Sequence, residues 1–462
     1  MSQTKTLAAY GAALRYEDIP SDVLNRAKNL TLQTLGVSLG ALGSDVGRRA
    51  VELGRIMGGG SSEATIWGEG SKVSAAAAGL ANGTLADALD WEDCSWTGHP
   101  SACAVSTAFA VAEQLRASGK DYLLALITAY ELYERIAMAV QPGPDFGWMT
   151  KGWGLTSWAI YASSIAGGKL LGLDAEAMEN LIGITGALTP TINVLPHVTR
   201  TDYYHFQWGL NSFSGIAGAH LAKVGISPLP DYLDGDSGYW CTMTDICKWE
   251  WYTKNLGSQW MIMETLMKHW PTNMWIQQPL DGMAELIAAH ALKPADIASI
   301  TISPEVESRW HVHPEGYNSV VDGQFSIPYC VAAMLHHPAP TQEWYSEKFR
   351  HDPSVVELSA RVHHRGEYLR LQQCFEMFQR GEYPHYDITV ETTDGRTLRK
   401  EVPLPKGHPR NMMTDAEFLE RFHLVADPVL GTEKAARVAD MVINMEALEC
   451  AGDIADAMRV EK

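Results

Sequence analysis

The sequence lacks several features that mark particular classes of protein. Its seven cysteines are widely scattered and include no Cys-x-x-Cys pair, so we expect neither a disulfide framework nor a structural zinc site. There is no apolar run of about 18 residues, and residues 1–10 lack an apolar segment behind a basic start. We therefore expect no membrane span and no secretory signal, and a cytoplasmic protein.

Positive charge is also scarce. Lysine and arginine together number 36 against 55 aspartate and glutamate residues, which gives a net charge of −19. A surface of this charge repels a phosphate backbone or an anionic membrane, so nucleic acid and membranes are not expected partners. The apolar fraction of 46% indicates a globular chain with a large interior.

The first 270 residues carry the periodicity of helices, often rich in Ala and Gly. Apolar spacing predicts helices at 16–60, 75–89, 122–138, 158–171, 175–188 and 214–224. Gly79 and Gly83 would let another helix approach the 75–89 helix closely. At 462 residues the chain is too long for one compact core, so two domains are expected.

After Pro271 the pattern changes. Strands are predicted at 298–303, 386–392 and 398–402, the last two joined by an Asp394-Gly395 hairpin turn. Helices are predicted at 279–292, 326–335 and 356–362, and helices return from Thr414 and at 433–450. The predicted fold is mainly α. A large all-helical domain of residues 1–270 plus 411–462 receives a smaller α+β domain, 271–410, as an insertion.

The stretch 82–101 brings acids, hydroxyls, a thiol and a histidine into a turn between two apolar helices. Asp90 and His99 suit general acid and base roles, because imidazole titrates near neutrality and burial can raise a carboxyl pKa toward it. Asp90 could instead cap a helix and His99 could be a buried structural residue, while Glu92 and Asp93 suit either role.

A metal site is the other reading of these side chains. Asp90, Asp93 and His99 offer carboxylate and imidazole ligands, as does the pair in His311-Val312-His313. Neither group has the spacing of a known metal motif, so we expect no metal.

Several short segments, in their order and spacing, resemble the MmgE/PrpD family, which includes 2-methylcitrate dehydratase, cis-aconitate decarboxylase and iminodisuccinate epimerase. The resemblance covers nearly the whole chain. It is carried by Asn82-Gly83-Thr84 leading to Leu89-Asp90-Trp91-Glu92-Asp93 and His99-Pro100-Ser101, and by residues 167–173, 268–271, 324–329 and 407–413.

The resemblance implies an all-helical domain with an inserted α+β lid, a cleft between them, a homodimer, and catalysis without metal or organic cofactor. Its members move a proton on carbon beside a carboxylate, which requires a base and groups that stabilise negative charge. The catalytic residues it implies are Asp90, His99, Lys268 and Tyr329. The candidate substrate-binding residues are Cys94, Thr97, Trp153, Gly154, Tyr204, His205 and Gln207, although Cys94 suits packing better than a nucleophilic role because no basic neighbour is evident to lower its pKa.

The chain departs from the family pattern at two places. Gly154 stands where the dehydratase and decarboxylase branches usually carry a histidine, and Tyr204 and Gln207 stand where they carry a lysine and a histidine. His205, Arg200 or His197 could substitute. Eight tryptophans flank these segments, although core packing explains some of them: Trp91, Trp96, Trp148, Trp153, Trp158, Trp208, Trp270 and Trp275.

Together these departures predict a substrate with one or two carboxylates and a bulkier apolar or hydroxylated remainder. The first functional hypothesis is a cofactor-independent lyase, a dehydratase or decarboxylase acting on a carboxylic acid. The second is an epimerase or isomerase of the same fold. The third is a non-catalytic ligand-binding relative, against which the retention of Asp90, His99, Lys268 and Tyr329 argues.

Overall fold

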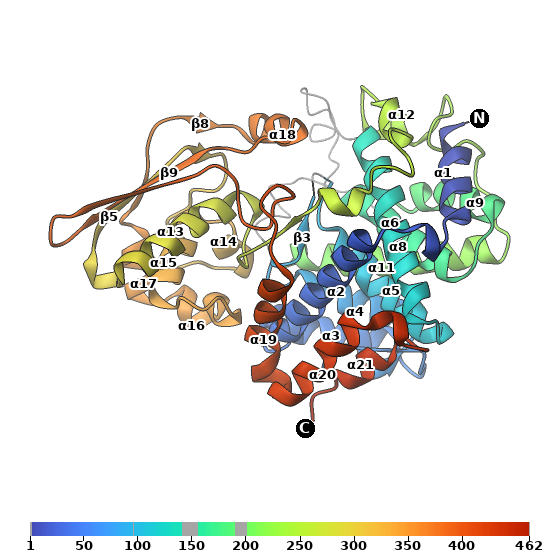
Figure 1. The fold of residues 1–462 in the computed structure, drawn as a ribbon, viewed down its shortest axis with the longest axis horizontal. Helices are drawn as coiled ribbons and strands as arrows, with labels where there is room; N and C mark the ends of the chain where they lie inside the picture. Colours follow the sequence, from blue (N-terminus) through green and yellow to red (C-terminus); the bar gives the residue numbers. More distant parts are fainter. Residues whose placement is uncertain (1, 96, 141–155, 190–200, 462) are drawn as a thin grey trace.

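The structure, a computed structural model, describes residues 2–95, 97–140, 156–189 and 201–461. Helices dominate it, and the mainly α fold class is confirmed (Figure 1). The helices that come before residue 250 are α1 (Gln3–Ala13), α2 (Ser21–Ala41), α3 (Asp45–Met57), α4 (Ala75–Asp87), α5 (Pro100–Leu115), α6 (Gly119–Val140), α8 (Thr156–Leu170), α9 (Ala175–Ala187), α11 (Tyr203–Lys223) and α12 (Tyr239–Met243).

Small residues allow the central helices to pack backbone against backbone. A Cβ atom on Gly209 of α11 would lie 2.2 Å from the carbonyl oxygen of Leu80 in α4. At Gly83 of α4 it would meet the Cα atom of Gly209 at 3.1 Å. The close approach expected at Gly83 is therefore confirmed. Its consequence is that side chains at the end of α4 and the start of α11 share one buried space.

A four-stranded sheet forms the core of the second part of the chain. Its order is β10 (Thr397–Val402), β9 (Tyr386–Thr392), β5 (Ile297–Ser303) and β7 (Val362–His364). The β9–β10 hairpin turns at Gly395, whose φ of 86° favours glycine, as the Asp394-Gly395 pair predicted. Buried and more exposed residues alternate along β5 and β9, so one face packs, in part against α13 (Gln277–His290).

Short helices and strands complete this part. They are α14 (Val320–Gln324), α15 (Ile327–His336), α16 (Glu347–Arg350), α17 (Pro353–Ser359), α18 (Leu371–Gln379), and the two-stranded pair β6 (Glu305–Val306) and β8 (Tyr368–Leu369). Figure 1 shows them gathered with the sheet at the left of the molecule, while the helical bundle occupies the right.

The C-terminal helices return to the first bundle. They are α19 (Asp415–Leu430), α20 (Thr432–Ile443) and α21 (Asp453–Ala457). The start of α19 has the capping box expected at Thr414, whose hydroxyl accepts from Glu417 N while the Glu417 carboxylate accepts from Thr414 N. Helix α19 packs along α2, where a Cβ atom on Gly36 would lie 3.0 Å from Phe422 (Figure 1). The sheet region therefore interrupts a bundle built from both ends of the chain.

Three predicted elements differ from those observed. Helix α11 begins at Tyr203 rather than near Ser214, so the candidate residues at 204–207 lie on a helix. Helix α17 ends at Ser359, because Val362 pairs in parallel with Ile300 in the sheet. Helix α20 ends at Ile443, where a short 3-10 turn, Met445–Ala447, follows it.

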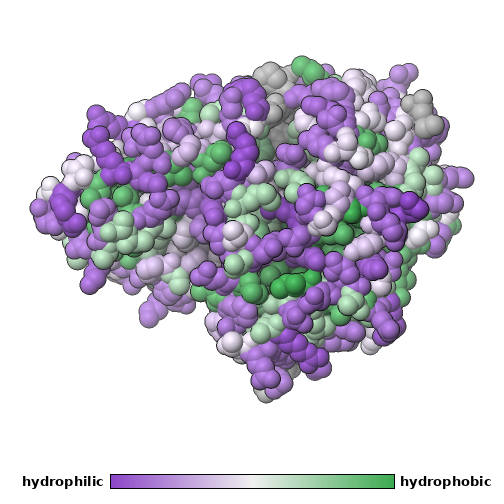
Figure 2. Space-filling model, in the orientation of Figure 1, coloured by the Kyte–Doolittle hydropathy of each residue, from purple (hydrophilic) through white to green (hydrophobic). Residues whose placement is uncertain are grey.

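The surface agrees with the composition. On the face shown in Figure 2 most residues are hydrophilic, and hydrophobic residues form scattered patches. Among the described helices, none is both long and apolar enough to cross a membrane. All seven cysteines are free, as their spacing predicted.

Candidate active site

A turn after α4 brings three carboxylates together. Asp87 is the last residue of α4, and Asp90 follows in the left-handed region, with φ of 51°, while its N–H donates to Asp87 O at 2.7 Å. Short polar side chains such as Asp tolerate this conformation better than β-branched ones. Asp87, Asp90 and Glu92 are all fully buried.

Lysine 268 reaches this turn through a two-stranded ladder. Strand β3 (Asp93–Cys94) pairs antiparallel with β4 (Leu266–Met267), which places Lys268 beside Glu92. The Lys268 ammonium group donates to Asp90 Oδ1 and to Glu92 Oε1, each at 2.6 Å. Lys268, 178 residues from Asp90 in the sequence, thus partly neutralises the negative charge of the carboxylates in this turn.

His99 lies at the start of α5, directly before Pro100 at its first position. Its Nδ1 atom is 2.8 Å from Asp87 Oδ1 and 2.5 Å from Glu92 Oε1. Its ring stacks on Trp208, with ring centroids 4.7 Å apart and an interplanar angle of 11°. The imidazole is therefore fixed on one edge by carboxylates and on one face by an indole.

The other ring nitrogen of His99 points toward α11. The Tyr204 hydroxyl lies 3.2 Å from His99 Nε2. The next residue, His205, places Nδ1 2.6 Å from Asp87 Oδ2, so Asp87 bridges two imidazoles. The Nε2 atom of His205 is buried and has no hydrogen-bond partner within the described parts of the chain.

Burial and mutual charge set the protonation of this group. Burial raises the pKa of Asp90 to about 6, against the opposing charge of Lys268. Burial and Lys268 lower the pKa of His99, but Glu92 and the hydrogen bond with Asp87 outweigh them and raise it well above its usual value. Burial opposes ionisation of Asp87, yet His205 and His99 hold its pKa below the usual range. His99 therefore carries a proton at neutral pH, and Asp90 exchanges one near pH 6.

The set of possible metal ligands in the structure differs from the predicted set of Asp90, Asp93 and His99. Asp93 turns away, since its carboxylate accepts from Ser101 N at 3.0 Å and from the Tyr130 hydroxyl at 2.7 Å. Asp87, Asp90, Glu92 and His99 instead offer ligand atoms within 4.8 Å of one another. Carboxylate and imidazole atoms can hold a divalent ion. The Lys268 ammonium group already contacts two of these carboxylates, so the group has a cation of its own.

Other predicted residues surround the turn. The Cys94 thiol lies 3.5 Å from Ser95 O and from Met274 Sδ. The Thr97 hydroxyl donates to Glu134 Oε2 at 2.5 Å, and the Gln207 amide donates to Tyr204 O at 3.2 Å. Among the other candidates, Trp153, Gly154, His197 and Arg200 lie outside the described residues.

The structure does not bring Tyr329 to this group. Its hydroxyl donates to the carbonyl oxygen of Trp344, and its ring contacts Tyr317 and Tyr345. Within the described chain that hydroxyl makes no hydrogen bond to the carboxylates or to His99. The geometry therefore gives no support to the catalytic role that the resemblance implies for Tyr329, which stays a prediction.

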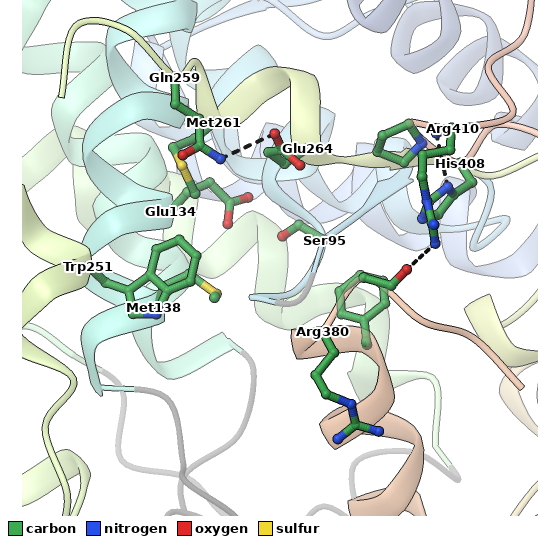
Figure 3. Close-up of a pocket in the computed structure, with 13 residues that line it drawn as sticks. Ser95, Glu134, Met138, Trp251, Gln259, Met261, Glu264, Arg380, His408 and Arg410 are labelled. Carbon is green, nitrogen blue, oxygen red and sulfur yellow. Dashed lines mark hydrogen bonds between the residues drawn. The ribbon is translucent and has the colours of Figure 1, made fainter. Parts of the chain in front are cut away.

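A cavity of about 350 Å³ opens beside the same turn (Figure 3). Ser95 and Glu134 line it together with Arg380 and Arg410, which come from the part of the chain that holds the four-stranded sheet. Asp90, His99 and Lys268 are buried and do not line it. Ser95, on the cavity wall, directly follows strand β3, and Glu92 of the buried group directly precedes that strand.

The sequence matches two domain models, of the MmgE/PrpD N-terminal domain at residues 5–251 and of the MmgE/PrpD C-terminal domain at residues 270–447. The chain belongs to the MmgE/PrpD family.

Curated relatives of this MmgE/PrpD protein agree with the domain matches. Cis-aconitate decarboxylase of Homo sapiens is 25% identical over 97% of this chain and 92% of its own length. Cis-aconitate decarboxylase of Aspergillus terreus is 25% identical over 96% and 93%, respectively. The cis-aconitate decarboxylase-like protein oryM of Aspergillus oryzae is 24% identical over 96% and 94%. The family and these relatives support a lyase-type activity on carboxylic acids.

Some members of the buried group were not singled out in the sequence. Asp87 was overlooked because it lies inside an apolar helix pattern, although its spacing of three from Asp90 places both at one helix end. Arg309 was overlooked too. It is buried, its Nε donates to Asn273 Oδ1 at 2.7 Å, and its charge acts on Asp90 and Tyr204. Arg309 lies in a loop, where no helical or strand periodicity in the sequence marks a residue as buried.

Proposed function

We propose that this protein is a cofactor-independent lyase, a dehydratase or decarboxylase, that transfers a proton at carbon adjacent to a carboxylate of its substrate. The observation that carries the proposal is His99, a buried imidazole held between Asp87 and Glu92 and facing a hydroxyl at its other nitrogen. A histidine held in its protonated form is a general acid.

The roles follow from charge and position. His99 delivers a proton to the leaving hydroxyl in a dehydration, or to the carbon left by carbon dioxide in a decarboxylation. Asp90, with its pKa raised to about 6, accepts and returns a proton near neutral pH. Lys268 stabilises the negative charge that develops on the substrate carboxylate. Because these groups are buried, their interactions are stronger than in water.

An epimerase or isomerase of the same fold is the second candidate. One observation favours it: the group pairs an acid, His99, with a carboxylate that exchanges its proton near pH 6, which suits removal and return of a proton without a leaving group. A dehydration and an isomerisation can begin with the same removal of a proton from carbon and differ in their products, whereas a decarboxylation only adds a proton to carbon.

A proton NMR assay in deuterated water separates the candidates. The full chain is incubated with a panel of carboxylic acids that includes citrate, 2-methylcitrate and cis-aconitate. A decarboxylase releases carbon dioxide and places solvent deuterium on the carbon left behind, whereas a dehydratase releases water and loses a carbon-bound proton to the solvent. Deuterium that enters an otherwise unchanged acid would show an isomerase. Failure of every acid either to exchange or to react, although they bind, would favour the ligand-binding relative.

A homodimer is proposed as well, with α11 as part of its interface. Tyr203, Leu210, Leu221 and Val224 are exposed by 50%, 38%, 39% and 74%. Their spacing of 7, 11 and 3 residues places them on one side of the helix. An apolar stripe of this kind on a helical bundle fits a second copy of the chain. Light scattering of the Leu210→Glu, Leu221→Glu variant tests this: a monomeric wild type, or a variant that stays dimeric, contradicts it.

The cytoplasm remains the proposed location, supported by the seven free cysteines, which fit a reducing compartment. A fluorescent fusion imaged in the source cells would test it, and a signal confined to another compartment would contradict it.

A further inference from the structure

We propose that the cavity beside the turn binds the part of the substrate that lies away from the reacting carbon, and that this part is an apolar body ending in a second carboxylate. The proposal rests on the proposed function, because the ligand is the substrate of that reaction. Three features of the cavity carry it: its apolar walls, two arginines at its rim, and a buried carboxyl group at its inner side.

The walls are apolar. Met138, Trp251, Met261 and Phe378 contribute thioether and aromatic surface (Figure 3). The volume of about 350 Å³ lies in the lower part of the range typical of small-molecule sites, about 300–1,000 Å³. Flexible Met side chains and aromatic rings suit an alkyl or aryl group. A short, highly charged acid would leave this surface unused.

The rim is positive in a chain of strongly negative net charge. Arg380 follows α18 and pairs with Glu382 at 3.0 Å, where both side chains are more than half exposed. Arg410 donates to the carbonyl oxygen of Gly381. His408 lies beside them, but burial and the neighbouring Arg410 lower its pKa to about 4, so it is neutral at pH 7. Both arginines line the cavity, and either guanidinium group can bind a carboxylate with paired hydrogen bonds.

Glu134 forms the inner side of the cavity. Figure 3 shows its carboxyl group directed toward Ser95 and the cavity interior. It is only 2% exposed, its Oε2 accepts from the Thr97 hydroxyl, and its Oε1 has no hydrogen-bond partner in the described structure. A buried, unpaired polar atom is costly, and a ligand oxygen would give it a partner.

The protonation of Glu134 fits an anionic ligand. Burial raises its pKa to about 8, although hydrogen bonds from Thr97 and Ser95 oppose the rise. At neutral pH the carboxyl group is therefore uncharged. It donates a hydrogen bond to an oxygen at the inner end of the ligand and does not repel a carboxylate. Glu264, also on the wall, is exposed to water, which screens its charge.

Isothermal calorimetry with three probes tests the cavity without requiring turnover. Suberate has an apolar body and two carboxylates, octanoate lacks the second carboxylate, and succinate lacks the body. The wild-type full chain should bind suberate about ten-fold more tightly than either of the others, because octanoate loses the charged hydrogen bonds at the rim and succinate loses the contacts with the apolar walls. Equal affinity for suberate and octanoate would overturn the proposal.

Variants locate the binding. Arg380→Gln with Arg410→Gln should weaken suberate binding about ten-fold and leave octanoate unchanged. Arg396→Gln is the matched control, because Arg396 is also exposed and pairs with an acid two residues away, Asp394, but does not line the cavity. Unchanged suberate binding in the double variant, or an equal loss in the control, would overturn the assignment of the rim.

Glu134 is tested by two substitutions. Glu134→Gln retains a neutral donor and should bind suberate nearly as well as wild type, whereas Glu134→Ala should bind it more weakly. Tighter binding by Glu134→Gln would show that Glu134 is an ionised, repelling group and would contradict its role. Melting temperatures of all variants distinguish lost binding from lost folding.

The cavity and the proposed function can fail separately. His99→Gln should lose turnover and keep suberate affinity, because His99 does not line the cavity. Lost suberate discrimination with intact dependence of turnover on His99 would remove only the cavity proposal. Intact discrimination with turnover independent of His99 would remove only the proposed function.

Discussion

The Nδ1 atom of His205 lies 2.6 Å from Oδ2 of Asp87, the carboxylate whose other oxygen faces His99. This contact joins α4 to α11 across 118 residues of sequence. His205 acts through Asp87, so it is a positioning residue in the proposed mechanism. It keeps Asp87 ionised and oriented toward His99.

Replacing His205 by Ala should lower kcat by roughly ten-fold with little change in KM, because His99 loses part of its support while Lys268 is untouched. It should also lower the free energy of unfolding by about 1–3 kcal/mol, since Asp87 Oδ2 is left buried and unpaired. The kcat–KM split and urea unfolding check this. His205→Asn, which restores a donor, should recover part of both losses; if it recovers stability alone, His205 is merely structural.

The pH dependence of kcat/KM should be bell-shaped. Asp90 must lose a proton to act as a base, so activity should rise through about pH 6 and fall well above pH 6.5, where His99 loses its proton. The raised pKa of Asp90 also makes the free energy of unfolding depend on pH. The stability that Asp90 contributes is fully present below its unfolded pKa of about 3.9 and is lost as the pH rises through about 6. A profile flat across pH 5–7 would argue against Asp90 as the base.

Activity should survive exhaustive chelation. The ligand atoms of Asp87, Asp90, Glu92 and His99 lie within 4.8 Å of one another, but Lys268 already supplies a positive charge there. The measurement is turnover before and after prolonged treatment with EDTA, with metal analysis of the treated protein. Loss of activity that a single divalent metal restores would identify these four residues as a metal site.

Citrate, 2-methylcitrate and cis-aconitate should be poor substrates compared with alkyl- or aryl-substituted acids that carry one or two carboxylates. Tyr204 and Gln207 bring no formal charge to positions where the family usually has Lys and His, and each lost charge-assisted hydrogen bond is worth about 1.5–3 kcal/mol. The comparison is kcat/KM across both sets of acids. Efficient turnover of cis-aconitate would show that Arg309, His205 or another cation restores the family pocket.

Local signals in the sequence predicted much of the fold. The Asp394-Gly395 pair located the hairpin, and Thr414 with Glu417 located the start of α19. The start of α11 was missed because residues 203–208 are mostly aromatic and polar, with weak helix preference, and Asp202 makes no side-chain capping bond. Strand β7 was missed because its three residues are a strand only by pairing with β5. The predicted domain boundaries at 270 and 411 stay a prediction.

The candidate site was predictable only in part. Asp90 and His99 share one turn, and the family resemblance added Lys268, so these three could be named together. The contacts of Asp87 with His205, and of Thr97 with Glu134, depend on helices that meet only after folding. The role of Tyr329 stays a prediction, since a matching segment named the residue type but could not give the direction of its hydroxyl, which donates to the carbonyl oxygen of Trp344.

The most direct test of the account is the turnover of Asp90→Asn and His99→Gln on the best substrate of the acid panel, followed by proton NMR in deuterated water. Both variants should keep the wild-type circular dichroism spectrum and lose ~10²–10⁴-fold in kcat, as expected for general acid–base groups. Proton transfer between the substrate carbon and the solvent should fall in parallel. Wild-type turnover and wild-type proton transfer in either variant would contradict the claim that these two buried side chains carry the proton.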